Sequence, residues 1–230
     1  MTQRWKTYIY ILSLAISLSC ASAVYAQSEQ KQMTFVESVD SVPLFNGVAV
    51  SADVAGMVQY AVSDYGQFEG AVRVNLRDTY FPIVEIGIGK ANHDDAVTLI
   101  HYTSSAPYIR IGVDYNLMNN KHDLYRIYGG IRYATTYFKY DISHPELTDP
   151  YWGDTAPYEA KGVKCNYHWA EIVGGVDAHI VGPLRMGWSV RYRKRLSHSD
   201  GPLGNVWYVP GFGKTGSSRL GVTFNVSLSI

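Results

Sequence analysis

Three arginines, Arg191, Arg193 and Arg195, occupy alternate positions near the end of one segment. Alternate side chains of an extended chain share one face, so the three guanidinium groups could together bind a phosphate-bearing ligand such as lipopolysaccharide. We favour a structural interpretation, in which arginines pair with carboxylates in salt bridges. Acidic loop residues such as Asp149 and Asp154 could also neutralise the excess of positive charge.

Ser189, His179 and Glu171 have the side chains of a serine hydrolase and are predicted to share a face. A triad needs one continuous chain of hydrogen bonds. We expect His179 near one end of the protein and Glu171 near the other, so the three groups cannot meet. The sequence therefore predicts no enzyme, and a membrane-embedded hydrolase is the least favoured alternative.

The segment GFGKTG, residues 211–216, has part of a phosphate-binding loop motif. That motif needs glycine where Tyr208 stands and a helix afterwards, whereas a strand pattern follows, so we interpret the segment as a glycine-rich surface loop. Two groups of histidine and acidic residues, 93–95 and His198 with Asp200, match no known metal-site spacing. We predict neither a metal nor a cofactor.

The elements that carry these residues are predicted to be strands. In the final segment, SRLGVTFNVSLSI, every second residue is apolar, which is typical of a strand with one apolar and one polar face. No helical period of useful length is evident. The same alternation predicts eight strands, covering approximately residues 48–58, 67–77, 81–90, 107–117, 123–140, 166–181, 184–196 and 218–230.

The polar faces of these strands carry charge, most of it arginine and very little lysine. Arginine pairs with carboxylates in bidentate fashion, which suits an enclosed polar network. A soluble barrel with an apolar interior would show the reverse pattern. The charged residues predicted to face inward are Asp53, Glu69, Arg73, Arg77, Glu85, Arg110, Asp114, Arg126, Arg132, Glu171, Asp177, Arg185, Arg191, Arg193 and Arg195.

The short turns predict which charges face each other across neighbouring strands. In an antiparallel hairpin, opposite residues have a constant sum of residue numbers, and opposite charges across a strand pair are favourable. The turns predict three interior salt bridges, Arg73 with Glu85, Asp114 with Arg126, and Glu171 with Arg193. The lumen of an eight-stranded barrel is just wide enough to be filled by side chains, so these pairs should plug it.

Short and long connections alternate along the chain, as in up-and-down barrels of outer membranes. The long connections, approximately 91–106, 141–165 and 197–217, are predicted to be extracellular loops. Aromatic residues should form girdles at the two membrane interfaces. We assign Tyr80, Phe81, Tyr115 and Tyr125 to the short-turn end and Tyr102, Tyr108, Tyr137, Tyr140, Tyr167 and Tyr192 to the long-loop end.

The first residues have the composition of a secretory signal peptide, with cationic residues, a short apolar run and small residues up to Ala26. We therefore predict a signal peptide over 1–26, a flexible periplasmic lead-in over 27–46 and one barrel domain over 47–230. Cleavage after Ala23 also fits, and Cys20 offers a lipoprotein alternative. Without Cys20, Cys165 is the one remaining cysteine and can form no intrachain disulfide.

Several longer stretches, among them DYGQFEGAVRVNLRDTYFPIVEIGIGKA, SAPYIRIGVDYN and KCNYHWAEIVGGVDAHIVGPLRMGWSVRYRKRL, together with WYVPGFGKTG, resemble the uncharacterised family named domain of unknown function 6048. The resemblance extends from about residue 46 to 230. It implies an exported outer-membrane β-barrel of a Gram-negative bacterium and no particular activity.

The sequence thus predicts an all-β, eight-stranded antiparallel up-and-down transmembrane β-barrel with a polar, salt-bridged interior, located in the outer membrane. Its expected role is non-enzymatic, either structural or a surface interaction through the long loops, and the runner-up is a barrel that binds a lipid or anionic glycolipid. The expected partners are outer-membrane lipid, lipopolysaccharide and the barrel assembly machinery. A formal net charge of +0 argues against nucleic acid as a partner.

Overall fold

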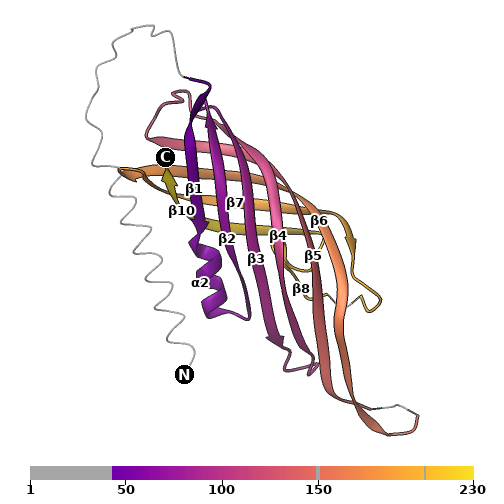
Figure 1. Ribbon diagram of the computed structural model, residues 1–230. Coiled ribbons are helices and arrows are strands. Elements are labelled where there is room, and N and C mark those ends of the chain that lie inside the picture. The colour runs from indigo at the N-terminus through magenta and orange to yellow at the C-terminus, as the bar shows by residue number, and fades with distance from the viewer. Residues whose placement is uncertain (1–42, 149–150, 205) are drawn as a thin grey trace, which may run out of the picture. The chain divides into compact units, whose positions relative to one another are not determined.

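The structure, a computed structural model, describes residues 43–148, 151–204 and 206–230. Within these ranges eight antiparallel strands close into a barrel in the ring order β1-β10-β7-β6-β5-β4-β3-β2 (Figure 1). The barrel strands are β1 (Phe45–Asp53), β2 (Tyr65–Leu76), β3 (Tyr80–Asp94), β4 (His101–Asn116), β5 (Tyr125–Thr148), β6 (Thr155–Val181), β7 (Leu184–Ser199) and β10 (Ser218–Ser229). The predicted signal peptide, Cys20 and most of the predicted lead-in lie outside the described residues.

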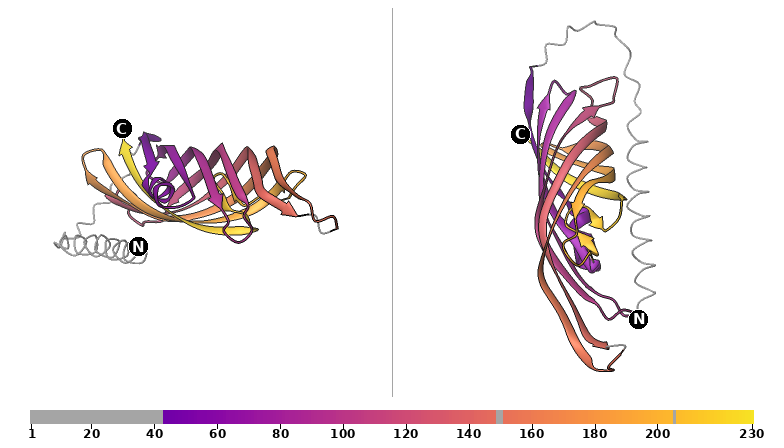
Figure 2. Two further views of the ribbon diagram at one scale, coloured as in Figure 1. Left: turned by 90° about the horizontal axis from the view of Figure 1, so that it is seen from below. Right: turned by 90° about the vertical axis from the view of Figure 1, so that its right-hand side faces the viewer.

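The barrel has two different ends. We call the end with the connections 77–79, 117–124 and 182–183 the turn end, and the opposite end the loop end. At the loop end, two of the predicted long loops are largely strand, because β3 and β4 pair as far as Asp94 with His101 and β5 and β6 pair as far as Thr148 with Thr155. The β5–β6 hairpin extends beyond the rest of the barrel (Figure 2).

The first predicted strand is wrong in its second half. β1 ends at Asp53, and the chain continues as the helix α2 (Val54–Val62). Asp53 is the N-cap of this helix, and its carboxylate accepts a hydrogen bond from the Ala55 amide, which satisfies one of the free N–H groups at a helix start. The apolar alternation from residue 54 onward therefore belongs to a helix of nine residues, short enough to hide its period.

The barrel is polar inside and apolar outside, as the alternation predicts. Of the charged residues assigned to the polar faces, twelve are buried and only Arg77, Arg185 and Arg195 are not. The exposed outer face carries large apolar side chains, including Val72, Val84, Ile86, Ile88, Ile109, Ile111, Ile131, Ile172, Val190 and Val222. Side chains of opposite character therefore alternate across the barrel wall.

The aromatic assignment is wrong for half of its members. Phe81, Tyr102, Tyr108, Tyr140 and Tyr167 are buried inside the barrel, each at most 4% exposed, whereas Tyr80, Tyr115, Tyr125, Tyr137 and Tyr192 are on the outer face. The buried tyrosines at the loop end belong to an apolar cluster with Phe138, Trp169 and Phe212. The loop end of the lumen is thus filled by aromatic rings and the middle by charges.

Candidate functional site

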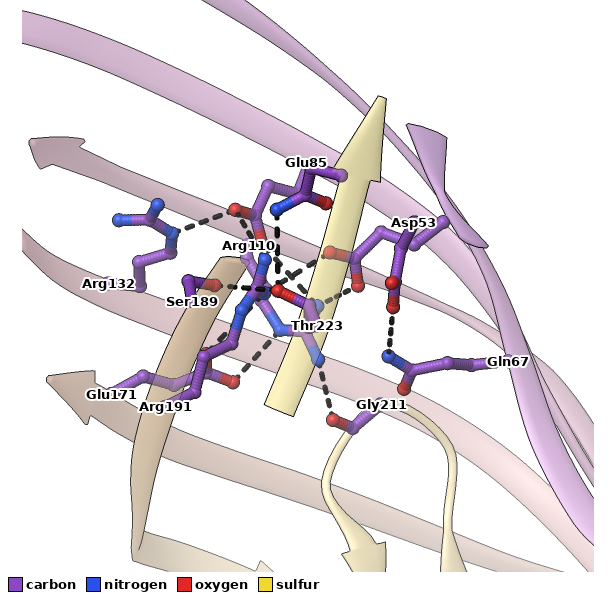
Figure 3. Close-up of polar contacts among 12 residues, drawn as sticks. Asp53, Gln67, Glu85, Arg110, Arg132, Glu171, Ser189, Arg191, Gly211 and Thr223 are labelled. Carbon is purple, nitrogen blue, oxygen red and sulfur yellow. Dashed lines mark hydrogen bonds and ion pairs between the residues drawn. The ribbon is translucent and has the colours of Figure 1, made fainter. Parts of the chain in front are cut away.

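The centre of the lumen is organised around Arg110 on β4 (Figure 3). Its Nε donates to Glu171 at 2.9 Å, and its Nη1 pairs with Glu69. Its Nη2 donates to the backbone carbonyl of Gly211 at 2.6 Å. Arg110 is completely buried, so a charge placed here must be fully paired, and these contacts provide the pairing.

Glu85 on β3 is the second hub of this network. It accepts hydrogen bonds from Arg132 Nε at 2.8 Å and Arg191 Nη1 at 2.7 Å. Arg132 also forms a two-pronged contact with Asp114, at 2.7 and 3.1 Å. Because β3, β4, β5 and β7 each contribute a charged group, this network ties side chains from opposite parts of the ring together.

Two of the three predicted salt bridges are wrong. Arg73 lies across from Ile83 rather than Glu85, and Asp114 lies across from Gly130 rather than Arg126. Arg73 instead contacts Asp114 at 3.2 Å.

The register differs because the turns differ from those assumed. At the β2–β3 turn, residues 77 and 78 both have a positive φ, of 55° and 54°, which reverses the chain earlier than expected. At the β4–β5 connection, the residues after Asn120 remain in the loop. There the His122 amide donates to Asn120, and Lys121 Nζ donates to the Asn116 carbonyl.

The third predicted pair lies on neighbouring strands. Glu171 is directly across from Arg193, and the Arg193 Nε is 3.4 Å from the carboxylate. On its other side Glu171 is across from Arg132, and its nearest donors are Arg110 and the Trp169 indole at 2.6 Å.

Toward the turn end, three arginines share one carboxylate. Arg126 is across from Asp177 and pairs with it, Arg185 Nε lies 3.3 Å from Asp177, and Arg73 Nη1 lies 3.7 Å away. The guanidinium of Arg126 also lies over the Phe81 ring, 4.1 Å from its centroid, a cation–π contact. These residues line a cavity of about 240 Å³ at this mouth of the barrel.

The three arginines of the predicted anion site are not equivalent. Arg191 is buried and pairs with Glu85 and Glu69, so its charge is used within the network. Arg193 is buried and donates from Nη1 to the Phe212 carbonyl at 2.9 Å. Arg195 is partly exposed, at the edge of the barrel.

Residues 206–215, which we call the plug segment, pack against the buried aromatic cluster at the loop end of the lumen. The segment contains the small hairpin of β8 (Tyr208–Val209) and β9 (Gly213–Lys214). Val209 and Phe212 are 0% exposed. Of the predicted glycine-rich surface loop, residues 211–216, Gly211 and Phe212 are buried, whereas Lys214 and Thr215 are exposed. The surface-loop interpretation is therefore wrong for the first two residues of that segment.

Strand side chains hold the backbone of the plug segment. Tyr102 donates to the Tyr208 carbonyl at 2.8 Å, and the carbonyls of Gly211 and Phe212 accept from Arg110 and Arg193 as described above. The Phe212 ring packs edge-on against Trp169 at 5.8 Å. Buried backbone carbonyls need such partners, since none of them can bond to bulk water.

Glycine allows the plug segment to approach the barrel wall. Gly211 has a φ of 81°, and a Cβ atom there would be 2.5 Å from the Tyr108 ring. On the facing strand, a Cβ at Gly89 would be 2.7 Å from Pro210. Side chains at either position would push the segment out of the lumen.

The residues considered for catalysis have other partners. Ser189 bonds to Thr223 at 2.6 Å, and His179 contacts the Gly182 carbonyl at 2.6 Å in a turn. Glu171 belongs to the ionic network, so the three groups do not form a triad. Among the described residues there is no group of three or more histidine, cysteine or acidic side chains that could hold a metal ion.

Asp53 organises the place where strand β1 ends. Besides capping α2, its Oδ1 accepts from the Phe224 amide on β10 at 3.2 Å, and its Oδ2 accepts from Gln67 on β2 at 3.4 Å. Beyond this point β10 pairs with β7 alone and β2 with β3 alone. From Asp53 to the loop end, α2 therefore takes the place of strand β1 in the barrel wall (Figure 1).

The distribution of side chains defines the environment of the barrel. An apolar band outside a closed barrel with a charged, hydrogen-bonded interior is the arrangement of transmembrane barrels. No helix in the described part of the chain is long and apolar enough to cross a membrane. The protein is an outer-membrane β-barrel.

The solved structures that are similar to this chain include two bacterial proteins. One is the N-terminal β-barrel domain of OprF from Pseudomonas aeruginosa, with 11% identity and a TM-score of 0.35, covering 80% of this chain and 98% of that one. The other is Ail, the attachment invasion locus protein of Yersinia pestis, solved with the heparin analogue sucrose octasulfate, with 10% identity and a TM-score of 0.36, covering 80% of this chain and 93% of that one.

A search among curated proteins gives no match. The family model named domain of unknown function 6048 matches residues 7–230, which is most of the sequence. The chain therefore belongs to the family of domain of unknown function 6048.

Proposed function

We propose that this protein is a non-enzymatic barrel whose lumen is plugged and which acts as a structural element of the outer membrane and through its extracellular surface. The observation that carries the proposal is the filling of the lumen at two levels. Charged side chains from six strands fill the middle, and the plug segment fills the loop end.

The remaining spaces inside the barrel support a closed lumen. Two cavities beside the ionic network, lined by residues such as Ser51, Glu69 and Tyr128, have volumes of about 10 Å³ each. A space of this size holds about one water molecule. Among the described residues, spaces of this size between the cavity at the turn end and the loop end support a lumen closed to solute.

The surface role is proposed for the β5–β6 hairpin. Its exposed side chains include Leu147, Tyr151 and Trp152, the last two 92% and 83% exposed. Large exposed apolar groups at the tip of a projecting hairpin are suited to contact another surface. Lipopolysaccharide and the barrel assembly machinery remain proposed partners. Residues 1–26 remain the proposed signal peptide, and residues 27–46 the proposed periplasmic lead-in.

Single-channel recording in planar bilayers tests the plug. The wild-type protein should give no stable conductance steps under conditions in which a general porin conducts. A variant with residues 206–214 replaced by a flexible glycine-serine linker, combined with Arg110→Ser and Glu85→Ser, should give measurable steps. Stable steps from the wild-type protein would show that the lumen is open.

A matched control separates the plug from general damage to the barrel. Replacing residues 144–152, of the same length and at the tip of the β5–β6 hairpin, should leave the barrel silent. Each variant should first show the change in gel migration on boiling that marks a folded barrel. If the hairpin replacement conducted as well as the plug replacement, the conductance would not report on the plug.

A further inference from the structure

The replacement of a strand by α2 leaves a cleft in the barrel wall. The cleft has a volume of about 710 Å³ and lies between α2 and β10, with the plug segment at its inner side. This volume is in the range of small-molecule binding sites, about 300–1,000 Å³. Its lining includes the exposed residues Leu220 and Val222, so the cleft reaches the outer face of the barrel.

The helix packs closely against β2 and also contacts β10. A Cβ atom at Gly56 would be 2.8 Å from Gln67, and one at Gly66 would be 2.3 Å from Tyr60, so helix and strand β2 touch backbone to backbone. The corresponding residues of β10, including Leu220 and Val222, line the cleft instead. The opening therefore lies on the β10 side of the helix.

The lining of the cleft is mixed: Gln59, Ser63 and Gln67 are polar, and several other residues form apolar walls. On the helix they include Ala55, Val58 and Val62, and on β10 Leu220 and Val222. The whole sequence of α2, VAGMVQYAV, contains no charged residue. In an outer-membrane barrel these walls are continuous with the apolar band, so a hydrocarbon chain can enter from the bilayer.

The loop end of the cleft is cationic. Lys214 and Arg219 are exposed there, and Arg193 lies buried at the inner side. Arg219 is held in place because its Nε and Nη2 donate to the carbonyls of Lys214 and Thr215, at 2.8 and 2.6 Å. Lys214 Nζ lies over the rings of Tyr65 and Trp207, 5.4 and 4.9 Å from their centroids.

The acidic residue of the cleft does not neutralise these cations. Asp53 lines the cleft at the opposite, deeper end of α2 and is 1% exposed. Its oxygens are occupied by the amides of Ala55 and Phe224 and by Gln67. Among the lining residues, Asp53 is the one carboxylate, and of the three cations Arg193 pairs with Glu171 inside the barrel, so Lys214 and Arg219 remain to contact a ligand.

We propose that this cleft binds one lipid with a phosphate-bearing headgroup, taken laterally from the surrounding membrane. The phosphate contacts Lys214 and Arg219 at the loop end. One acyl chain lies along the apolar walls formed by α2 and β10, toward the middle of the bilayer. The proposal goes beyond the closed barrel of the preceding section, because the cleft lies in the wall and needs no open lumen.

Native mass spectrometry of the purified protein in detergent tests the site with three defined lipids. Dioleoylphosphatidic acid supplies both the phosphate and the acyl chains, and dioleoylglycerol supplies the chains alone. Dioleoylphosphatidylcholine has a zwitterionic headgroup, in which the choline cation balances the charge of the phosphate. Retention of phosphatidic acid should exceed that of dioleoylglycerol by about tenfold, which corresponds to about 1.4 kcal/mol. Equal retention of the three lipids would overturn the proposal.

Two double variants locate the effect. K214Q/R219Q should lower the retention of phosphatidic acid about tenfold, because it removes the two headgroup contacts. The matched control K139Q/K161Q removes two exposed lysines from β5 and β6 and should retain the lipid like the wild-type protein. If K214Q/R219Q also retained it unchanged, the cleft would not be the binding site.

Further measurements identify the source of the phosphate and the position of the chain. Millimolar inorganic phosphate should not displace phosphatidic acid, and complete displacement would indicate a small-anion site instead. Phosphatidic acid with a photoreactive acyl chain should label residues 54–62 and 218–222, and labelling elsewhere alone would contradict the cleft. Because gel migration on boiling and conductance are measured separately, failure here leaves the proposed closed barrel untouched.

Discussion

The two halves of the lumen are filled by different means. In the middle and toward the turn end, side chains of the barrel strands meet as charged pairs, with Glu85, Arg110 and Asp177 as hubs. At the loop end, aromatic rings and the plug segment fill the space, and α2 replaces part of the wall. The ionic half depends on pairing around the whole ring, whereas the loop-end half depends on one inserted segment.

The largest effect is expected from the ionic half. Glu85→Leu would leave Arg132, Arg191 and Arg110 facing an apolar side chain, and removing one partner of a buried ion network costs about 3–5 kcal/mol. The midpoint of urea unfolding in lipid vesicles, followed by gel migration, should fall accordingly. Glu146→Leu on the exposed hairpin serves as the control and should change little. If Glu85→Leu lowered the stability only slightly, water or other groups would be balancing the charges of the arginines.

A smaller and more local effect is expected at the plug. Phe212→Ala removes a ring that is 0% exposed and packs on Trp169, at a cost of about 3 kcal/mol. We expect protease cleavage between residues 200 and 217 to increase strongly while the folded band persists on the gel. If the folded band disappeared as cleavage of the plug segment increased, the two halves of the lumen would form one cooperative unit.

A smaller loss of stability is expected at the junction between β1 and α2. Asp53→Ala removes the cap of α2 and leaves the Phe224 amide without its acceptor, and lost caps cost about 1–2 kcal/mol. Hydrogen exchange should rise in residues 54–62 and at Phe224 and stay unchanged in β5 and β6. Asp154→Ala, in the exposed loop, is the control. Uniform faster exchange would contradict a local role for Asp53.

The smallest effect is expected at the turn end, outside the apolar band. Burial alone would raise the pKa of the Asp78 carboxyl, but hydrogen bonds from Asn75, His122 and Asn46 outweigh it and lower the pKa below its ordinary value. The ionised form is therefore favoured in the folded state. Its contribution to the free energy of unfolding is complete above about pH 4, the ordinary pKa of aspartate, and is lost as the pH falls through the lowered value.

Comparing the wild-type protein with Asp78→Asn measures this contribution. The difference in stability should be about 0.5 kcal/mol at pH 7, since the group is partly exposed, and should shrink toward pH 3. Thr79→Val, in the same turn, provides a control without a titratable group. A difference that grew on acidification would show that the neutral carboxyl is the favoured form.

For the ionic half, the sequence was enough to predict which charged residues face inward, but not which of them pair with each other. Alternation placed the charges inside because the period of a strand is fixed. Pairing failed where turns such as 77–79 reversed the chain at a different residue, since a shift of register moves every pair in a hairpin. Arg73 was therefore placed inside correctly but assigned to the wrong acid.

The loop-end half was harder to predict, although some signals were present. Tyr102 and Tyr108 share the parity of the inward-facing residues, which should have placed them inside. The plug segment contains the run VWYVPGF, too apolar for a solvated loop. Its partners on β4, Arg110 and Tyr102, are 101 and 106 residues away in sequence, so spacing alone could not reveal the hydrogen bonds that hold it.

The pairing of β1 with β10 covers only Ala49 to Asp53, whereas β10 pairs with β7 from Ser218 to Leu228. These two strands are also the pair most distant in sequence, so bringing them together costs the most chain entropy and gains few backbone hydrogen bonds. We therefore expect ring closure to be the last step of assembly. Until then the sheet is open beside β10, and residues 206–215 can enter the interior sideways instead of threading through a finished ring.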